Sequence, residues 1–194
     1  KPSLPVQSVA DLIKLAKAKP GVLNDASSGP GTPYHMAGEL FKAMAGVDIQ
    51  HIPYKGSSGA RNDLLGGQVD MMFDAVPTMA GFAETGKVRA LATTGQKRSD
   101  VLPNLPTVAE AGVPGYEAVI WLGRMAQRNT PPAITGKLNA QITRIVNDPA
   151  VRQAWAKQGA APMSMTIPEF TQYLNDDIAK WAKVVKVSGA KVDE

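Results

Sequence analysis

Two periodicities of apolar residues alternate along the first half of the chain. Spacings of three and four residues have the pattern of amphipathic helices, which are predicted over residues 9–16, 36–44, 60–65 and 77–86. Between these helices lie short apolar or alternating stretches with the pattern of β-strands. The predicted strands are residues 22–26, 47–53, 69–73 and 88–93.

Strands that alternate with helices in this way indicate βαβ units and a mostly parallel sheet with helices on both faces. In such sheets ligands bind outside the carboxyl ends of the strands. The predicted strand ends carry Ser27-Ser28-Gly29, Pro53-Tyr54-Lys55-Gly56 and Phe73-Asp74. We therefore expect these three loops to lie together on one rim of the sheet.

The second half of the chain has a different character. Residues 97–115 are rich in proline and glycine and predict a crossing segment, and residues 117–126 are aromatic and strand-like. Three amphipathic helices are predicted next: 131–146, a short one after Pro149, and a long one opened by a capping box at 166–169, with Phe170, Leu174, Ile178, Trp181 and Val185 as its buried stripe. These helices carry more apolar surface than they can bury on one another. We expect them to need a sheet that the chain does not obviously contain.

The loop from residue 27 to residue 32 has the composition of an anion cradle. Gly29 and Gly31 let backbone amides turn toward a ligand, and the following helix start adds unpaired N–H groups and a favourable dipole. Thr32 is a good N-cap, and Pro33 suits the first helical position. The alternative interpretation is an ordinary capped turn between a strand and a helix.

A carboxylate is the ligand that this loop would suit. Its oxygens would accept hydrogen bonds from the hydroxyls of Ser27 and Ser28 and from amides near Gly29, Gly31 and Thr32. We predict these five residues as the centre of a binding site.

Other candidate side chains follow the second and third strands. Tyr54 would form an apolar wall with a hydroxyl handle. Lys55 is either a second contact for the anion or a solvated lysine. Asp74 would accept from an ammonium or hydroxyl group of the ligand, or cap the next helix. His35, in the first turn of its helix, either points to the rim or is a packed surface histidine, and His51, within a strand, is interpreted as structural.

Composition narrows the function classes. The 194 residues are 44% hydrophobic and 20% charged with a net charge of +4, as in ordinary soluble globular proteins, and no apolar run approaches a membrane span. The absence of cysteine excludes disulfides and thiolate chemistry, and two histidines without clustered carboxylates disfavour a metal site. The basic and aromatic residues do not interleave, so no nucleic acid partner is expected.

An enzyme is the rival class, because Ser27, His35 and Asp74 are the residue types of a hydrolytic triad. The sequence has no Gly-x-Ser-x-Gly elbow, and His35 lies on the element that Ser27 precedes, which disfavours the required geometry. The loop also lacks the Lys-Ser/Thr pair of a P-loop and the spaced glycines of a dinucleotide fold. We therefore predict no catalytic residues and no cofactor.

Six segments carry a specific resemblance to a known family. They are 23–33 (LNDASSGPGTP), 37–41 (AGELF), 52–56 (IPYKG), 63–69 (DLLGGQV), 73–74 (FD) and 105–112 (LPTVAEAG). In order and spacing they are similar to the Bug (TctC-like) solute receptors of tripartite tricarboxylate transporters. The similarity extends from the first residues to about Lys186.

The resemblance implies an α/β fold of the type II periplasmic-binding-protein class, a two-lobed Venus flytrap without catalysis. It implies a periplasmic receptor whose lobes close on a small carboxylate, such as a di- or tricarboxylate, an acidic amino acid or an aromatic acid. Such a receptor then docks on the membrane permease subunits of the transporter. In the family, the loop that corresponds to residues 27–32 grips a carboxyl group of the ligand.

One departure from the family changes the expected domains. Family members have an N-terminal segment ahead of the position of Lys1, and it supplies most of the sheet of the first lobe. By analogy, residues 1–122 are the second lobe with the ligand loop, and residues 123–194 are the returning helices of the first lobe. A second copy or a separate N-terminal fragment would complete the cleft. The alternative is a structural or interaction remnant that binds no solute.

Overall fold

The computed structural model describes residues 1–188 and residue 190. By internal contacts the chain forms two units. The first contains Lys1–Val119 and the residues from Ala182 onward, and the second is Ile120–Trp181. The predicted boundary between lobes at residue 122 stays a prediction. Within the predicted second domain, residues 123–194, positions 189 and 191–194 lie outside the described part of the chain.

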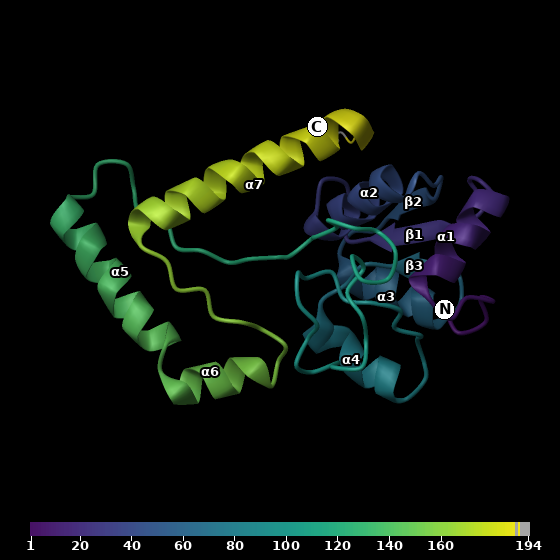
Figure 1. Cartoon of the computed structure of the whole chain (residues 1–194), viewed down its shortest axis with the longest axis horizontal. Coiled ribbons are helices and arrows are strands. Elements are labelled where there is room, and N and C mark those ends of the chain that lie inside the picture. The colour runs from purple at the N-terminus through teal and green to yellow at the C-terminus, as the bar shows by residue number, and fades with distance from the viewer. Residues whose placement is uncertain (189, 191–194) are drawn as a thin grey trace. The chain divides into compact units, whose positions relative to one another are not determined.

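A small parallel sheet organises the first unit (Figure 1). Its strands are β1 (Asn24–Ser27), β2 (Gln50–Pro53) and β3 (Met71–Met72), in the order β2-β1-β3. Both pairings with β1 are parallel. The three strands therefore end at the same edge of the sheet, as the βαβ pattern predicted.

Four helices connect the strands of this unit or lead into them. They are α1 (Val9–Ala18), α2 (Pro33–Ala45), α3 (Ser57–Leu65) and α4 (Val76–Glu84). The predicted N-cap is confirmed, since Thr32 caps α2 with Pro33 as its first residue, and Ser8 caps α1 in the same way, its Oγ accepting from Asp11 N at 3.1 Å. Gly46 ends α2 in the left-handed conformation, with φ of 62°.

An aromatic group forms part of the core behind β1 and β3. Phe41, Phe73 and Tyr116 have ring centroids 5.9–6.3 Å apart, and Tyr116 is 1% exposed. The Tyr116 hydroxyl donates to the carbonyl of Ala37 at 2.9 Å, which satisfies its polar atom inside the core. This contact ties the segment before residue 119 to helix α2.

The predicted fourth strand, residues 88–93, is not a strand. Its one ladder contact is an isolated parallel bridge between Thr93 and Thr107. The short segment after Thr107 is a set of turns. Its capping box nevertheless forms, because Thr107 N donates to Glu110 Oε2 at 2.9 Å and Glu110 N donates to Thr107 Oγ1 at 3.1 Å.

The second unit contains helices with little buried surface. They are α5 (Pro132–Val146), α6 (Pro149–Ala156) and most of α7 (Ile167–Ser188). The capping box before α7 is confirmed, since Thr166 N donates to Glu169 Oε2 at 2.8 Å. Trp121 Nε1 and Trp181 Nε1 donate to the two carboxylate oxygens of Asp177 at 2.9 and 3.0 Å.

Two predictions for this half are wrong in detail. Residues 117–126 form no strand. The predicted buried stripe of the long helix is partly open, with Ile178 exposed to 59%, and on α5 Ile134 and Leu138 are each 51% exposed. The physical reason agrees with the one inferred from the sequence: the second unit contains no strand, so it offers these helices no sheet of its own to cover.

Candidate functional site

The loops after β1, β2 and β3 meet at the carboxyl edge of the sheet, and we call residues 27–32, 53–57 and 73–75 the rim. Backbone hydrogen bonds join the first two loops, from Tyr54 N to Ser27 O and from Gly56 N to Ser28 O, each at 3.1 Å. The predicted gathering of the loops is thus present. Helices α2, α3 and α4 all begin at the rim, so three helix N-termini lie at this edge.

The glycine loop, residues 27–32, is held by its own polar groups. The Gly29 carbonyl accepts from Thr32 Oγ1 at 2.7 Å, and the Gly29 amide donates to Ser27 Oγ at 3.1 Å. The Gly31 amide donates to His35 Nδ1 at 3.0 Å. Gly29 has a φ of 133°, and a Cβ there would lie 3.2 Å from the Tyr54 carbonyl. The predicted amide donors of Gly29 and Gly31 are therefore engaged within the protein, by Ser27 of the loop and by His35 of α2.

Both histidines lie behind the glycine loop in one stacked pair. The rings of His35 and His51 are 3.7 Å apart at 15°. His51 Nε2 lies 2.6 Å from Ser27 Oγ, and His35 Nε2 lies 3.3 Å from a carboxylate oxygen of Glu39. Burial, followed by the neighbouring His35, lowers the pKa of His51 to about 4. His51 is therefore neutral near pH 7, in agreement with its predicted structural role.

This arrangement differs from the rival triad. Ser27 contacts His51 rather than His35, and its side chain is fully buried at 0% exposure. Asp74 pairs with Arg61. A nucleophile needs access to its substrate, which a closed loop denies to Ser27.

The third loop holds a polar cluster that the sequence did not reveal. Arg61, on α3, binds Asp74 through two nitrogens and donates from Nη2 to Ser57 Oγ at 2.9 Å. The Asp74 side chain is only 2% exposed, and its Oδ1 also accepts from the Ala75 amide at 2.8 Å. The hydrogen bond to Asp74 raises the pKa of the Arg61 guanidinium. Both oxygens of the predicted ligand acceptor are thus occupied by the protein.

Tyr34 lies beside this pair. Burial, followed by the nearby Asp74 carboxylate, raises the pKa of the Tyr34 hydroxyl. A signal for Arg61 existed only in its position: it is the basic residue of the helix that follows the second loop. This position alone does not identify Arg61 as a site residue, because the sequence does not show that α3 turns its side chain toward Asp74.

The second loop presents the remaining candidates. The Tyr54 hydroxyl donates to Asp63 Oδ2 at 2.5 Å, and that hydrogen bond raises the pKa of Tyr54. Lys55 is exposed, whereas Ser28 and Thr32 are half-buried. Of the predicted site residues, Ser28, Gly31, Tyr54 and Lys55 retain exposed surface, and Ser27, Gly29 and Asp74 are turned inward.

A buried carboxyl group lies beneath the rim, on β1. Asp25 is 4% exposed, and no described residue makes a hydrogen bond to its Oδ1. Burial raises the pKa of this carboxyl well above its usual value. Within the described residues there is no group of three or more metal-ligating side chains and no helix long and apolar enough to cross a membrane.

Comparison with known proteins places this geometry in a family. The family described as tripartite tricarboxylate transporter family receptor matches residues 1–190. Protein BugT of Bordetella pertussis is 38% identical over 191 residues, which is 98% of this chain and 59% of BugT. The chain spans little more than half the length of the first curated relatives it matches.

Solved structures agree with this match. A protein of R. palustris solved with adipate has a TM-score of 0.86 and 39% identity. The match covers 98% of this chain and 64% of the R. palustris chain. The periplasmic binding protein BugD has a TM-score of 0.82 and 30% identity, and the match covers 100% of this chain and 65% of BugD. MatC from Rhodopseudomonas palustris with bound malate has a TM-score of 0.80 and 29% identity, and the match covers 95% of this chain and 64% of MatC. The predicted α/β periplasmic-binding-protein class is confirmed, and so is the prediction of a solute-binding family rather than an enzyme family.

Proposed function

The chain belongs to the tripartite tricarboxylate transporter family of receptors, and we propose that it takes up a small carboxylate at the rim for such a transporter. The observation that carries this proposal is the meeting of three helix N-termini and several hydroxyl groups at the carboxyl edge of the sheet. Helix N-termini favour anions, and hydroxyl groups donate to carboxylate oxygens. The adipate and malate in two similar structures are dicarboxylates, which supports this class of ligand.

We assign the predicted residues two roles according to their exposure and to whether their polar groups hold the loops together. Ser28, Gly31, Tyr54 and Lys55 retain exposed surface and would contact the ligand; of these, the Gly31 amide and the Tyr54 hydroxyl would do so in exchange for their bonds to His35 and Asp63. The remaining four predicted residues would shape the glycine loop and the third loop, because their polar groups are bonded within the protein. These are Ser27, Gly29, Thr32 and Asp74.

The cellular setting follows from the same relatives. BugD is a periplasmic binding protein, so we propose a periplasmic location for this chain, with permease subunits of a tripartite transporter as its partners. A second copy or an N-terminal fragment that closes the cleft would add contacts from the side opposite the rim. Binding that requires such a partner would depend on protein concentration.

Calorimetric titration with adipate and malate tests the proposal. We expect Ser28→Ala to weaken binding about fivefold, because it removes one hydroxyl donor worth roughly 1 kcal/mol. Ser3→Ala, at an exposed serine ahead of α1, is the matched control and should leave affinity unchanged. Thr32 is a poor choice for the alanine test, because it caps α2 and its loss would cost about 1 kcal/mol of stability.

Two results would contradict the proposal. Equal affinity of the Ser28→Ala and Ser3→Ala variants would remove the glycine loop from the site. Absence of binding to either acid up to millimolar concentration, at high as well as low protein concentration, would mean that this chain alone does not take up such carboxylates.

A further inference from the structure

Polar contacts on both sides fix the ring of His35 at the start of α2. The backbone amide of His35 lies within 3.5 Å of the capping Thr32 Oγ1, and its Nε2 lies 3.3 Å from a carboxylate oxygen of Glu39, one turn further along the helix. The other ring nitrogen, Nδ1, accepts from the Gly31 amide at 3.0 Å. A nitrogen that accepts carries no proton, so the neutral ring holds its proton on Nε2, toward Glu39. His35 therefore holds one amide of the glycine loop through an unprotonated nitrogen.

The Gly31 amide is free to turn away from this ring. Gly31 is exposed, and its φ of 71° lies in the left-handed region. Glycine exchanges this conformation for a right-handed one at no steric cost. The side chain of His35, by contrast, is 7% exposed, and its ring is stacked on that of His51 with centroids 3.7 Å apart. In this hydrogen bond the amide is the partner that can move, and the ring is the fixed one.

The charged and titratable groups that face His35 come from three elements. On α2, Glu39 Oε1 lies 3.3 Å from its Nε2 and 2.5 Å from Lys42 Nζ. On β2, His51 stacks on its ring, and on β1, Asp25 is in register with His51 and lies against the same helix. Glu39 favours a positive charge on His35, whereas Lys42 and the N-terminus of α2 oppose it. A ligand carboxylate at the glycine loop would add a further negative charge and move this balance toward a protonated ring.

The stacked pair has room for one proton, and its contacts assign that proton to His35. Two positive rings at the observed separation would repel each other. Burial, followed by the neighbouring His35, lowers the pKa of His51 to about 4. His51 Nε2 faces the hydroxyl of Ser27 at 2.6 Å, whereas His35 Nε2 faces the carboxylate of Glu39. A positive charge is therefore better compensated on His35 than on His51.

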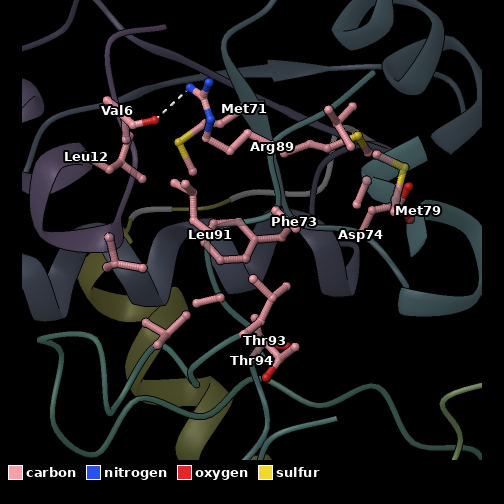
Figure 2. A pocket seen from close by; sticks show the side chains of 18 of the residues that line it. Val6, Leu12, Met71, Phe73, Asp74, Met79, Arg89, Leu91, Thr93 and Thr94 are labelled. Carbon is pink, nitrogen blue, oxygen red and sulfur yellow. Dashed lines mark hydrogen bonds between the residues drawn. The ribbon is translucent and has the colours of Figure 1, made fainter. Parts of the chain in front are cut away.

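An apolar cavity beside β3 offers no free carboxylate that would compete for this proton. Its volume is about 190 Å³. The side chains around it are mostly apolar, among them Met71, Phe73 and Leu91 (Figure 2). Neither histidine lines the cavity, and its two carboxylates, Asp70 and Asp74, are paired with Lys1 and Arg61.

We propose that His35 is a proton-linked latch on the glycine loop: a ligand carboxylate takes over the Gly31 N–H, and the freed Nδ1 of His35 binds a proton. The hydrogen bond from Gly31 N to Nδ1 breaks, one from Gly31 N to a carboxylate oxygen forms, and the proton comes from solvent. The ring changes from neutral to singly positive and pairs with Glu39. His35 touches no ligand in this scheme and is a positioning residue for Gly31.

This inference rests on the proposed carboxylate site and names a regulation of it. Ligand binding and proton binding are linked, so each strengthens the other by the same factor. The chain would therefore hold a carboxylate more tightly as the pH falls, and it would take up protons as it binds.

The latch is tested first without any ligand. In the isotope-labelled full chain, nuclear magnetic resonance follows the Gly31 amide and the His35 ring nitrogens from pH 5 to pH 8, where histidine side chains titrate. We expect both signals to change over the same pH interval, because a proton on Nδ1 removes the acceptor of the Gly31 amide. His35→Asn offers a side-chain oxygen near the position of Nδ1 but takes up no proton, so its Gly31 signal should stay constant. A Gly31 signal that does not follow the His35 ring overturns the latch.

Calorimetric titration with malate then measures the linkage. Titrations in two buffers of different ionisation enthalpy give the number of protons taken up per ligand. Near pH 7 we expect roughly half a proton or more, and an affinity that tightens by up to about tenfold for each unit of falling pH, the limit for one proton. Between pH 6.5 and pH 8, His35→Asn should bind malate without proton uptake, whereas His51→Gln should retain the uptake. All other titrating groups are common to the parent and His35→Asn.

The outcomes separate this inference from the carboxylate site itself. Proton uptake that His35→Asn abolishes supports the latch. Binding without uptake, or uptake that survives in His35→Asn, overturns the latch and leaves the carboxylate site standing. Absence of binding to malate and adipate at every pH contradicts the proposed function and overturns the carboxylate as the trigger, whatever the Gly31 signal shows. If His35→Asn does not fold, the parent alone decides, through its proton uptake and the shared titration of Gly31 and His35.

Discussion

Replacing Asp25 with asparagine is expected to stabilise the first unit, increasingly so as the pH rises. Asp25 lies in the central strand with its side chain against α2, so close that a Cβ on Gly38 would be 2.0 Å from Asp25 Oδ2. Its Oδ1 has no hydrogen-bond partner among the described residues. Ionising this carboxyl in the folded chain would place an unsolvated charge in the core.

The sign of the pH dependence follows from the direction of the pKa shift. Burial raises the pKa of the folded carboxyl well above 3.8, so between the unfolded and folded values the folded chain holds a proton that the unfolded chain has released. Stability is then fully present below pH 3.8 and falls by roughly 1.4 kcal/mol per pH unit above it, until the pH exceeds the folded pKa. Asparagine does not titrate, so the advantage of Asp25→Asn grows at the same rate.

Urea unfolding followed by far-UV circular dichroism at pH 5, 6 and 7 measures this difference. Tryptophan fluorescence is unsuitable, because Trp121, Trp155 and Trp181 all lie in the second unit. Other titrating groups are shared by both proteins and cancel when their unfolding free energies are subtracted. A difference between Asp25→Asn and the parent that stays constant across these three pH values would refute the reasoning.

Three further predictions test neighbouring contacts. Gly38→Ala is expected to cost about 1–3 kcal/mol in urea unfolding, because its methyl group meets the Asp25 carboxylate, and a smaller cost in an Asp25→Ala background would verify that contact. The pKa of His51 is about 4 in the folded chain against an ordinary 6.5, so the contribution of His51 to stability is present above pH 6.5 and lost as the pH falls toward 4. We expect His51→Gln to reduce this loss of stability in acid, measured by thermal melts. Asp74→Asn should alter the ranking of ammonium-bearing and plain dicarboxylates in calorimetry, since it weakens the hold on Arg61; an identical ranking would remove Asp74 from selectivity.

Features of the fold that depend on a few adjacent residues were predictable from the sequence. Ser8, Thr32 and Gly46 mark helix ends through contacts within their own turns. The three paired strands were also predictable in outline, because apolar runs between helices leave few other arrangements. Their bounds are shorter than predicted, since a strand ends where its neighbour ends.

The error at residues 88–93 has a physical cause. An alternating apolar segment becomes a strand only when another strand pairs with it, and Leu91 faces the cavity instead of a neighbour. The same reasoning applies to the exposed stripe of α7, which has the pattern of a buried helix without a surface to cover. Sequence pattern reports what a segment can bury, and the available partners decide whether it does so.

At the candidate site, too, the position of the residues was predictable and their bonding partners were not. Parallel topology was enough to bring Ser28, Tyr54 and Asp74 to one edge, because it requires only the order of strands and helices. The protein groups that bond to the two carboxylate oxygens of Asp74 were not predictable. Arg61 reaches Asp74 from the next helix along the chain, a contact set by the packing of α3 on the sheet rather than by any motif. A ligand that approached Asp74 would compete with a guanidinium, so we expect any selectivity at this edge to depend on the pair and not on the carboxylate alone.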